Sequence, residues 1–436
     1  MTDWTTDSND ALRLSMVRTT SGSETLTDQY SSEFFHPTFT YPIYGEEEKI
    51  YGYKDLLIDL RFSSGSLAQY LNVRYSQKLP SSTVDDVEGT LSKFIPPGYH
   101  QDEAAFLRQV EEDSLSFRPH GELIYSYPLP LDSLSLGKET AIHNEDTHQE
   151  GEGAITYEVY HVRSSTWDTP GFREYHSRLQ LFVLLYIEGG SYINEDEEPW
   201  EFMVLYEKRK RKESSTYHLV GYSSLYNFYH FPEKVRMRLS QFVILPLYQR
   251  QGHGSELYKA IYRYILSQPR IAELTVEDPA EAFEDLRDKN DLRMLFSHRQ
   301  FMKEGFGEHA ISYSGGRVGG IGKAKKSGRG GFTASVVTGK LGPPTDKAWA
   351  EKWRRDLKLA GRQFHRLVEM LILSRLDPLN AFAIKPYRLQ VKERLYRFNY
   401  EILAQLEKQE RLEKLEETFQ GVQADYQRIL RMAGFL

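Results

Sequence analysis

The sequence predicts an α/β (α+β) protein in which a sheet-containing core lies between an N-terminal α+β domain and a C-terminal helical domain. Three observations lead to this prediction. Strand-like segments follow one another closely between residues 157 and 245, a glycine-rich turn joins the last of them to an amphipathic helix, and helical patterns fill residues 346–432. Because the chain has 436 residues, two or three domains are expected.

Changes in composition predict the domain boundaries. Residues 1–35 are rich in Ser, Thr and Asp and are expected to be flexible, apart from the apolar stretch Ala11–Val17. Residues 36–132 are rich in aromatic and β-branched side chains and predict the N-terminal α+β domain. The remaining predicted parts are a polar linker over 133–154, the core over 155–314, a glycine-rich basic linker over 315–345 and the helical domain over 346–436.

Each element of the core follows from a local pattern. The run Leu179–Ile187 is apolar enough to predict a central buried strand. One apolar face predicts a helix over Ser255–Ser267, and a second helix is expected to begin at Pro279. The other expected strands are Tyr157–Val162, Trp200–Glu207, Tyr217–Tyr229, Val235–Leu245 and Ile271–Val276, and the other expected helices cover 346–375 and 386–432, with Pro386 as a first helical residue.

Composition and charge exclude several classes of protein. No apolar run is long enough to span a bilayer, so no membrane segment is expected. The net charge of -7 argues against extensive contact with nucleic acid and suits a basic partner better. The chain has no cysteine, which excludes disulfides, thiolate metal sites and an acyl-cysteine intermediate. No metal-ligand spacing is evident, and no metal is predicted.

The segment after the expected strand Val235–Leu245 is the most specific motif. It reads Gln249-Arg250-Gln251-Gly252-His253-Gly254-Ser255 and opens the amphipathic helix. Glycines at this point let main-chain N–H groups approach a phosphate, which the helix dipole also favours. No Lys-Ser/Thr pair follows, unlike in a Walker loop, and the third glycine of a dinucleotide-binding fingerprint is missing. The histidine in this loop is more readily explained by packing or phosphate contact than by catalysis.

Gln-x-x-Gly-x-Gly between a strand and a helix resembles the Gcn5-related N-acetyltransferases, which have a mixed-sheet core. The similarity extends further, because several segments resemble the catalytic subunit of type B histone acetyltransferase. They are WTTDSNDALRLSMV, FTYPIYGEEEKIYGYKDL, LLYIEGGSYI, SQFVILPLYQRQGHGS and LTVEDPAEAFEDLRDKND, which span residues 4–291. The C-terminal third of the chain matches only loosely.

This resemblance implies an activity. An acetyl group would pass from acetyl-CoA directly to lysine side chains on the N-terminal tail of newly synthesised histone H4, without an acyl-enzyme. It also implies a WD-repeat histone-binding subunit as a partner, no direct DNA binding, and a location in cytoplasm and nucleus. Two alternatives remain open: an acetyltransferase of the same fold acting on another protein or a small amine, and an inactive histone-binding scaffold. The intact Gly252, Gly254 and Glu277 argue against the scaffold.

The resemblance also implies roles for individual residues. Glu277 matches the general base, with Asp278 and Glu188 as nearby carboxylates. The cofactor contacts would come from Phe242, Val243, Ile244, Gln249, Arg250, Gln251, Gly252, His253, Gly254, Ser255, Ala280 and Lys289, where Ala280 replaces a polar residue of some relatives. The substrate contacts would come from Glu46, Glu47, Glu48, Tyr226, Asn227 and Phe228, with Trp200 and Tyr226 as walls of the lysine channel.

Ordinary structural roles compete with some of these assignments. Asp278 and Glu281 flank Pro279 with the spacing of a capping box, so helix capping is the favoured role of Asp278. Glu188 ends an apolar run before two glycines, where an acidic residue usually belongs to a solvated turn. The acidic cluster Glu46–Glu48 has the composition of a solvated loop, although it could also steer a basic histone tail.

Overall fold

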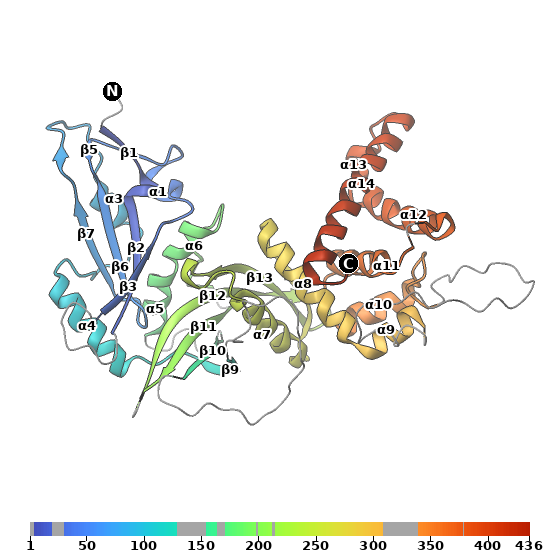
Figure 1. Ribbon diagram of the computed structural model, residues 1–436, viewed down its shortest axis with the longest axis horizontal. Helices are drawn as coiled ribbons and strands as arrows, with labels where there is room; N and C mark the ends of the chain where they lie inside the picture. The colour runs from blue at the N-terminus through green and yellow to red at the C-terminus, as the bar shows by residue number, and fades with distance from the viewer. Residues whose placement is uncertain are drawn as a thin grey trace, which may run out of the picture. The chain divides into compact units, whose positions relative to one another are not determined.

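The computed structural model describes residues 4–19, 30–128, 154–163, 171–197, 199–211, 214–307, 339–377 and 379–436. Within these residues the chain forms two compact units, one built from Met1–Arg270 with Val276–Asp278 and the other from Ile271–Thr275 with Pro279–Leu436 (Figure 1). Most of both expected linkers, residues 133–153 and 315–338, lies outside the described residues.

A four-stranded sheet forms the N-terminal part of the first unit. Its strand order is β3-β2-β6-β7, in which β2 runs parallel to β6 and the other pairs are antiparallel. The helix α4 (Glu103–Ser116), capped by Asp102, contacts β2, β6 and β7. The strands are β2 (Leu12–Thr19), β3 (Tyr30–Phe35), β6 (Leu57–Ser63) and β7 (Gln69–Arg74).

Short elements complete this part of the chain. The strand β1 (Thr5–Asp7) pairs with β4 (Lys49–Tyr51), and β5 (Tyr53–Lys54) pairs with β8 (Gln77–Lys78). The short helices are α1 (Ser8–Ala11), α2 (Tyr41–Tyr44) and α3 (Val87–Leu91). The apolar stretch Ala11–Val17, exempted from the predicted flexible segment, lies in α1 and β2, where Leu12 and Leu14 are buried. Regular structure also covers residues 5–10, 18–19 and 30–35, which were expected to be flexible, because these residues pair with or flank the buried strands.

An antiparallel sheet forms the centre of the first unit. Its strands follow the order β13-β12-β11-β10-β9. The helix α7 (His253–Ser267) contacts β9, β11 and β12. The strands are β9 (Glu122–Tyr127), β10 (Ile155–Val162), β11 (Trp200–Lys210), β12 (Ser215–His230) and β13 (Lys234–Ile244). Since β9 pairs with β10, this sheet begins before the predicted boundary at residue 155.

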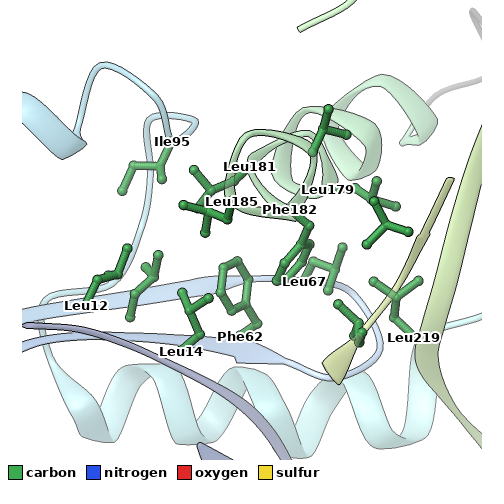
Figure 2. Close-up of a cluster of buried hydrophobic side chains, with 14 of the residues drawn as sticks. Leu12, Leu14, Phe62, Leu67, Ile95, Leu179, Leu181, Phe182, Leu185 and Leu219 are labelled. Atoms are coloured by element: carbon green, nitrogen blue, oxygen red, sulfur yellow. The ribbon is translucent and has the colours of Figure 1, made fainter. Parts of the chain in front are cut away.

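Two helices replace the strand that was predicted at Leu179–Ile187. They are α5 (Phe172–Leu179) and α6 (Leu181–Tyr186). Figure 2 shows Leu181, Phe182 and Leu185 of α6 packed toward side chains of the N-terminal sheet, and the rings of Phe182 and Phe62 lie 4.8 Å apart. The prediction was wrong because a short apolar run is compatible with either a buried strand or a helix that is buried on all sides.

The second unit is helical apart from most of β14 (Ile271–Val276), whose Leu274 forms a bridge to Leu359. Partly buried ion pairs join its helices, with 2.7 Å between Arg366 and Asp288 and 2.7 Å between Arg394 and Glu369. The helices are α8 (Glu281–Ser297), α9 (Arg299–Phe306), α10 (Lys347–Asp356), α11 (Gly361–Leu373), α12 (Ala381–Phe398), α13 (Tyr400–Leu403) and α14 (Lys408–Ala433).

Helix boundaries in this unit differ from the predicted ones. The helix expected over 346–375 is divided between α10 and α11, and the one expected over 386–432 is divided among α12, α13 and α14. Pro386 lies inside α12 and does not begin it, because Asn380 caps this helix by accepting hydrogen bonds from two main-chain N–H groups. No helix in the described part of the chain is both long and apolar enough to cross a membrane.

Candidate active site

The loop between β13 and α7 has the geometry of an anion cradle. After a short 3-10 turn, Pro246–Tyr248, the chain reaches Gly252, which is the N-cap of α7. Gly252 has a φ of 92°, a Cβ at this position would meet no atom within 4 Å, and no side chain caps the helix. Open space therefore surrounds Gly252 at the positive end of the helix dipole, where a phosphate could bind.

Two glutamine side chains brace this loop. The Nε2 of Gln249 donates to the carbonyl of Ile244 at 2.9 Å, and the Nε2 of Gln251 donates to the carbonyl of Leu247 at 2.8 Å. Arg250 between them has a φ of 60°. Since both amides bond to main-chain carbonyls, the groups that this loop can offer to a phosphate are its own main-chain N–H groups and the exposed side chain of Arg250.

His253 packs against the sheet, which is one of the two roles that the sequence left open. Its side chain is buried, its Nδ1 lies 2.8 Å from the hydroxyl of Tyr127 on β9, and its ring centroid lies 4.3 Å from that of Tyr157 on β10. Burial lowers the pKa of His253, which favours the neutral imidazole. Its role is to tie the start of α7 to the edge of the sheet. No sequence pattern indicated the part played by Tyr127.

Glu277 follows β14, and β13 holds both its main chain and its side chain. Its N–H donates to the carbonyl of Leu239 at 3.0 Å, and its Oε1 accepts a hydrogen bond from the Nη1 of Arg238 at 3.1 Å. The side chain remains 45% exposed. A carboxylate that is both anchored and accessible can accept a proton from a substrate, so Glu277 retains the geometry expected of a general base.

The structure gives different places to the other two candidate carboxylates. Asp278 has a φ of 28°, and the N-cap of α8 is Ala280, without a side-chain cap, so the predicted capping role of Asp278 was wrong. The left-handed turn at Asp278 moves the start of the helix beyond it. Glu188 is exposed just after α6, and the carbonyl of Ser191, three residues later, accepts a hydrogen bond from Gln241 of β13 at 2.9 Å.

Three aromatic side chains form a continuous wall on β11 and β12, which we call the aromatic wall: Trp200, Tyr226 and Phe228. Trp200 pairs with Tyr226 in the sheet register, and their rings meet edge to face with centroids 4.8 Å apart. The rings of Tyr226 and Phe228 are 4.6 Å apart, and the guanidinium of Arg238 lies 4.3 Å from the centroid of Phe228. The aromatic wall therefore leads, through Arg238, to Glu277.

Asn227 points in a different direction from its aromatic neighbours. Its amide donates to Glu201 at 2.7 Å, and Glu201 also accepts hydrogen bonds from His161 and Tyr264 at 2.8 Å each. Burial raises the pKa of Glu201, but hydrogen bonds from His161, Asn227 and Arg270 outweigh it and lower the pKa to about 2. This buried network joins β10, β11, β12 and α7 behind the aromatic wall, and nothing in the local sequence predicted it.

The acidic cluster at residues 46–48 separates into two kinds of residue. Glu46 and Glu47 are exposed after α2. Glu48 has a φ of 51°, and its carboxylate accepts the main-chain N–H groups of Thr40 at 2.6 Å and Tyr41 at 3.0 Å. Burial raises the pKa of Glu48, but these bonds outweigh it, so the pKa lies below its ordinary value. Glu48 thus stabilises α2, and only its two neighbours are available to a partner.

Two candidate cofactor residues remain. Ala280 and Lys289 belong to the second unit, at the start and in the middle of α8. No group of three or more His, Cys, Asp or Glu side chains that could hold a metal ion occurs among the residues that the structure describes.

Comparison with known proteins shows the family of this chain. The family described as histone acetyl transferase HAT1 N-terminus matches residues 4–188, and the acetyltransferase (GNAT) family matches residues 159–283. A histone acetyltransferase type B catalytic subunit of Cryptococcus neoformans var. neoformans is 48% identical over 442 residues, which cover 99% of this chain and 98% of that protein. The chain belongs to this family.

Other relatives carry the same description. The protein of Mycosarcoma maydis is 44% identical over 402 residues, covering 90% of this chain and 82% of the relative. That of Candida albicans is 34% identical over 441 residues, covering 98% and 90%. The family described as fungal HAT1, C-terminal, matches residues 336–377. The enzyme is therefore an acyltransferase with a GNAT core, and the predicted family and fold class are confirmed.

Proposed function

We propose that this enzyme transfers an acetyl group from acetyl-CoA directly to lysine side chains on the N-terminal tail of newly synthesised histone H4, with Glu277 as the general base. The observation that carries the proposal is the continuous line of contacts from the aromatic wall through Arg238 to Glu277. Aromatic rings suit the aliphatic stem of a lysine side chain, and a carboxylate beyond them suits its amine. The relatives are histone acetyltransferases by name, which supports a histone substrate.

The loop before α7 fits the pyrophosphate of coenzyme A. Gly252 leaves open space before an uncapped helix, and the neutral His253 fixes the loop from behind. We assign the pyrophosphate to the main chain of residues 249–255 and the pantetheine arm to the main chain of Phe242, Val243 and Ile244. The family resemblance supports Ala280 and Lys289 as further cofactor contacts in this proposal. When bound, acetyl-CoA would supply the acetyl group activated as a thioester.

The substrate amine must lose a proton before it can attack. A lysine side chain has a pKa near 10.4, so exposing its lone pair at pH 7 costs about 4–5 kcal/mol. Glu277 can accept this proton, directly or through one water. Glu188 and Asp278 are retained as secondary proton acceptors. Because the chain contains no cysteine, no thiol is present to carry the acetyl group, which supports direct transfer.

Initial rates of acetyl transfer test the substrate class. We expect the enzyme with acetyl-CoA to acetylate a histone H4 tail peptide far faster than spermidine or a peptide of the same composition and charge in scrambled order. The control is the same H4 peptide with its lysines replaced by arginine, which keeps the charge but removes the acceptor. Faster transfer to spermidine would show that the enzyme acts on small amines.

The partner and location belong to the same proposal. We propose that a WD-repeat histone-binding subunit accompanies the enzyme in cytoplasm and nucleus, without direct DNA binding. The family resemblance and the net charge of -7 support this. Affinity purification of the tagged chain followed by mass spectrometry should recover such a subunit, and imaging should place the chain in both compartments. A mobility shift of bare DNA at physiological salt would contradict the proposed absence of direct DNA binding.

A further inference from the structure

Arg238 lies between the aromatic wall and the proposed base, yet neither the sequence motifs nor the resemblance assigns it a role. We infer that Arg238 is a positioning residue that holds the carboxylate of Glu277 at the end of the aromatic wall, where the substrate amine would arrive. This inference rests on the proposed role of Glu277 as general base.

Two adjacent residues of β13 fix Glu277 at two points. Leu239 accepts the main-chain N–H of Glu277 at 3.0 Å, and Arg238 donates from Nη1 to its Oε1 at 3.1 Å. The side chain of Glu277 is 45% exposed. A glutamate exposed to this extent would otherwise sample several rotamers, since it has three rotatable bonds and little packing around it. The bond from Arg238 selects one direction and leaves Oε2 as the oxygen that would receive the proton.

The opposite side of Arg238 is fixed as well. Its guanidinium lies over the ring of Phe228 at 4.3 Å, and its main chain pairs with Tyr226 in the register of β12 and β13. Only arginine combines a flat cation, which stacks on a ring, with several N–H donors that point outward in the same plane. Because Arg238 contacts both Phe228 and Glu277, the rigid aromatic wall also holds the carboxylate of Glu277 in place.

The geometry also indicates why this residue matters to the rate more than to binding. Arg238 lies in the middle of β13, where it contacts the proposed base and one ring of the aromatic wall. The anion cradle lies after the C-terminal end of this strand, Ile244. Its removal should therefore misplace Glu277 and leave acetyl-CoA affinity intact. Small errors in the placement of a catalytic group reduce the rate by about tenfold to a hundredfold.

A double-mutant cycle tests this inference. Arg238→Met, Glu277→Gln and the double variant are compared with the wild type in steady-state kinetics with the histone H4 tail peptide. We expect Arg238→Met to lower kcat by about tenfold or more, with the KM for acetyl-CoA unchanged. In the Glu277→Gln background the same substitution should have no further effect, because Arg238 acts only through the carboxylate. Arg238→Lys should restore part of kcat.

Controls separate this role from general stability. Lys234→Met removes a positive charge from the start of the same strand and should leave kcat unchanged. Thermal melts of all variants verify folding. If Arg238→Met leaves kcat unchanged, or lowers it equally in both backgrounds, the positioning role is wrong. If Glu277→Gln itself keeps full turnover, Glu277 is not the general base. This result would overturn the proposed function, and it is distinguishable from a failure of the positioning role alone.

Discussion

The Nδ1 of His253 lies 2.8 Å from the hydroxyl of Tyr127, which precedes it by 126 residues. One hydrogen bond thus joins the first residue of α7 to the edge strand β9. Because the anion cradle, residues 249–255, includes the start of α7, this bond joins the cradle to the edge of the sheet.

Tyr127→Phe should weaken coenzyme A binding, because it frees the start of α7 and leaves the buried Nδ1 of His253 without its partner. We expect an affinity loss corresponding to about 0.5–1.5 kcal/mol. Titration calorimetry measures it. Tyr125→Phe is the matched control, since Tyr125 also joins β9 to α7 but bonds to Glu256, beyond the cradle. Equal losses in both variants would mean that the bond supports only the fold.

Gly252→Val should abolish coenzyme A binding in a folded protein. The side chain would fill the open space in front of the helix, and the φ of 92° costs an L-residue about 1–2 kcal/mol. Gly434→Val is the control, because Gly434 also has open space around it and a φ of 84° but lies at the C-cap of α14. It should lose similar stability and keep coenzyme A affinity. Near-normal affinity in Gly252→Val would overturn the cradle assignment.

Glu277→Gln should lower kcat and leave the Kd for coenzyme A unchanged. The loss should shrink as pH rises toward the lysine pKa of about 10.4, because the substrate amine then arrives already deprotonated. Each tenfold loss corresponds to about 1.36 kcal/mol in the activation barrier. The measurement is a pH series of kcat with the histone H4 tail peptide. Full turnover at pH 7 would transfer the role to Glu188 or Asp278.

Replacing Glu46 and Glu47 by Gln should raise the KM for the tail peptide, most of all at low salt, and leave kcat unchanged. Each exposed charge pair contributes about 0.2–1 kcal/mol. A salt series of peptide kinetics measures the effect, with the exposed pair Glu410 and Glu413 of α14, replaced in the same way, as the control. The same KM in both double variants would show that Glu46 and Glu47 do not contribute to peptide binding and belong to an ordinary solvated turn.

His218 should make stability fall as pH decreases. It is buried between the hydroxyls of Ser64 and Thr216, and burial lowers its pKa to about 3. In the unfolded chain this side chain takes up a proton below about pH 6.5, whereas in the folded chain it stays neutral until about pH 3. The free energy of unfolding should therefore drop by up to about 1.36 kcal/mol per pH unit between pH 6 and 4 from this group alone.

The variant His218→Gln isolates this contribution, because the other histidines are common to both proteins. Urea unfolding at pH 7, 6 and 5 measures the free energy. The difference between wild type and variant should shrink as pH falls. A difference that stays constant would show that His218 takes up a proton equally in both states.

Local patterns were sufficient for the elements on either side of the proposed anion cradle. The strand before it and the amphipathic helix after it were predicted within two residues of their observed bounds, since each depends on neighbours in the sequence. The same patterns were insufficient at Leu179–Ile187, where an apolar run alone does not distinguish a buried strand from a buried helix. The tertiary contacts of this segment, such as that between Phe182 and Phe62, favour the helix.

The sequence by itself determined the family, the fold class and the candidate base. The tertiary structure decided how these residues are held. Arg238, Tyr127 and Glu201 act on partners 39, 126 and 40 residues away in the chain, at Glu277, His253 and His161. No local period predicts such a pair, because each pair joins elements that are distant in the chain and meet only in the folded protein: two paired strands for Glu201 and His161, and a strand and a helix for Tyr127 and His253. For the same reason Glu48, which the sequence does not distinguish from its two neighbours, proved to be a structural residue once its bonds to Thr40 and Tyr41 were seen.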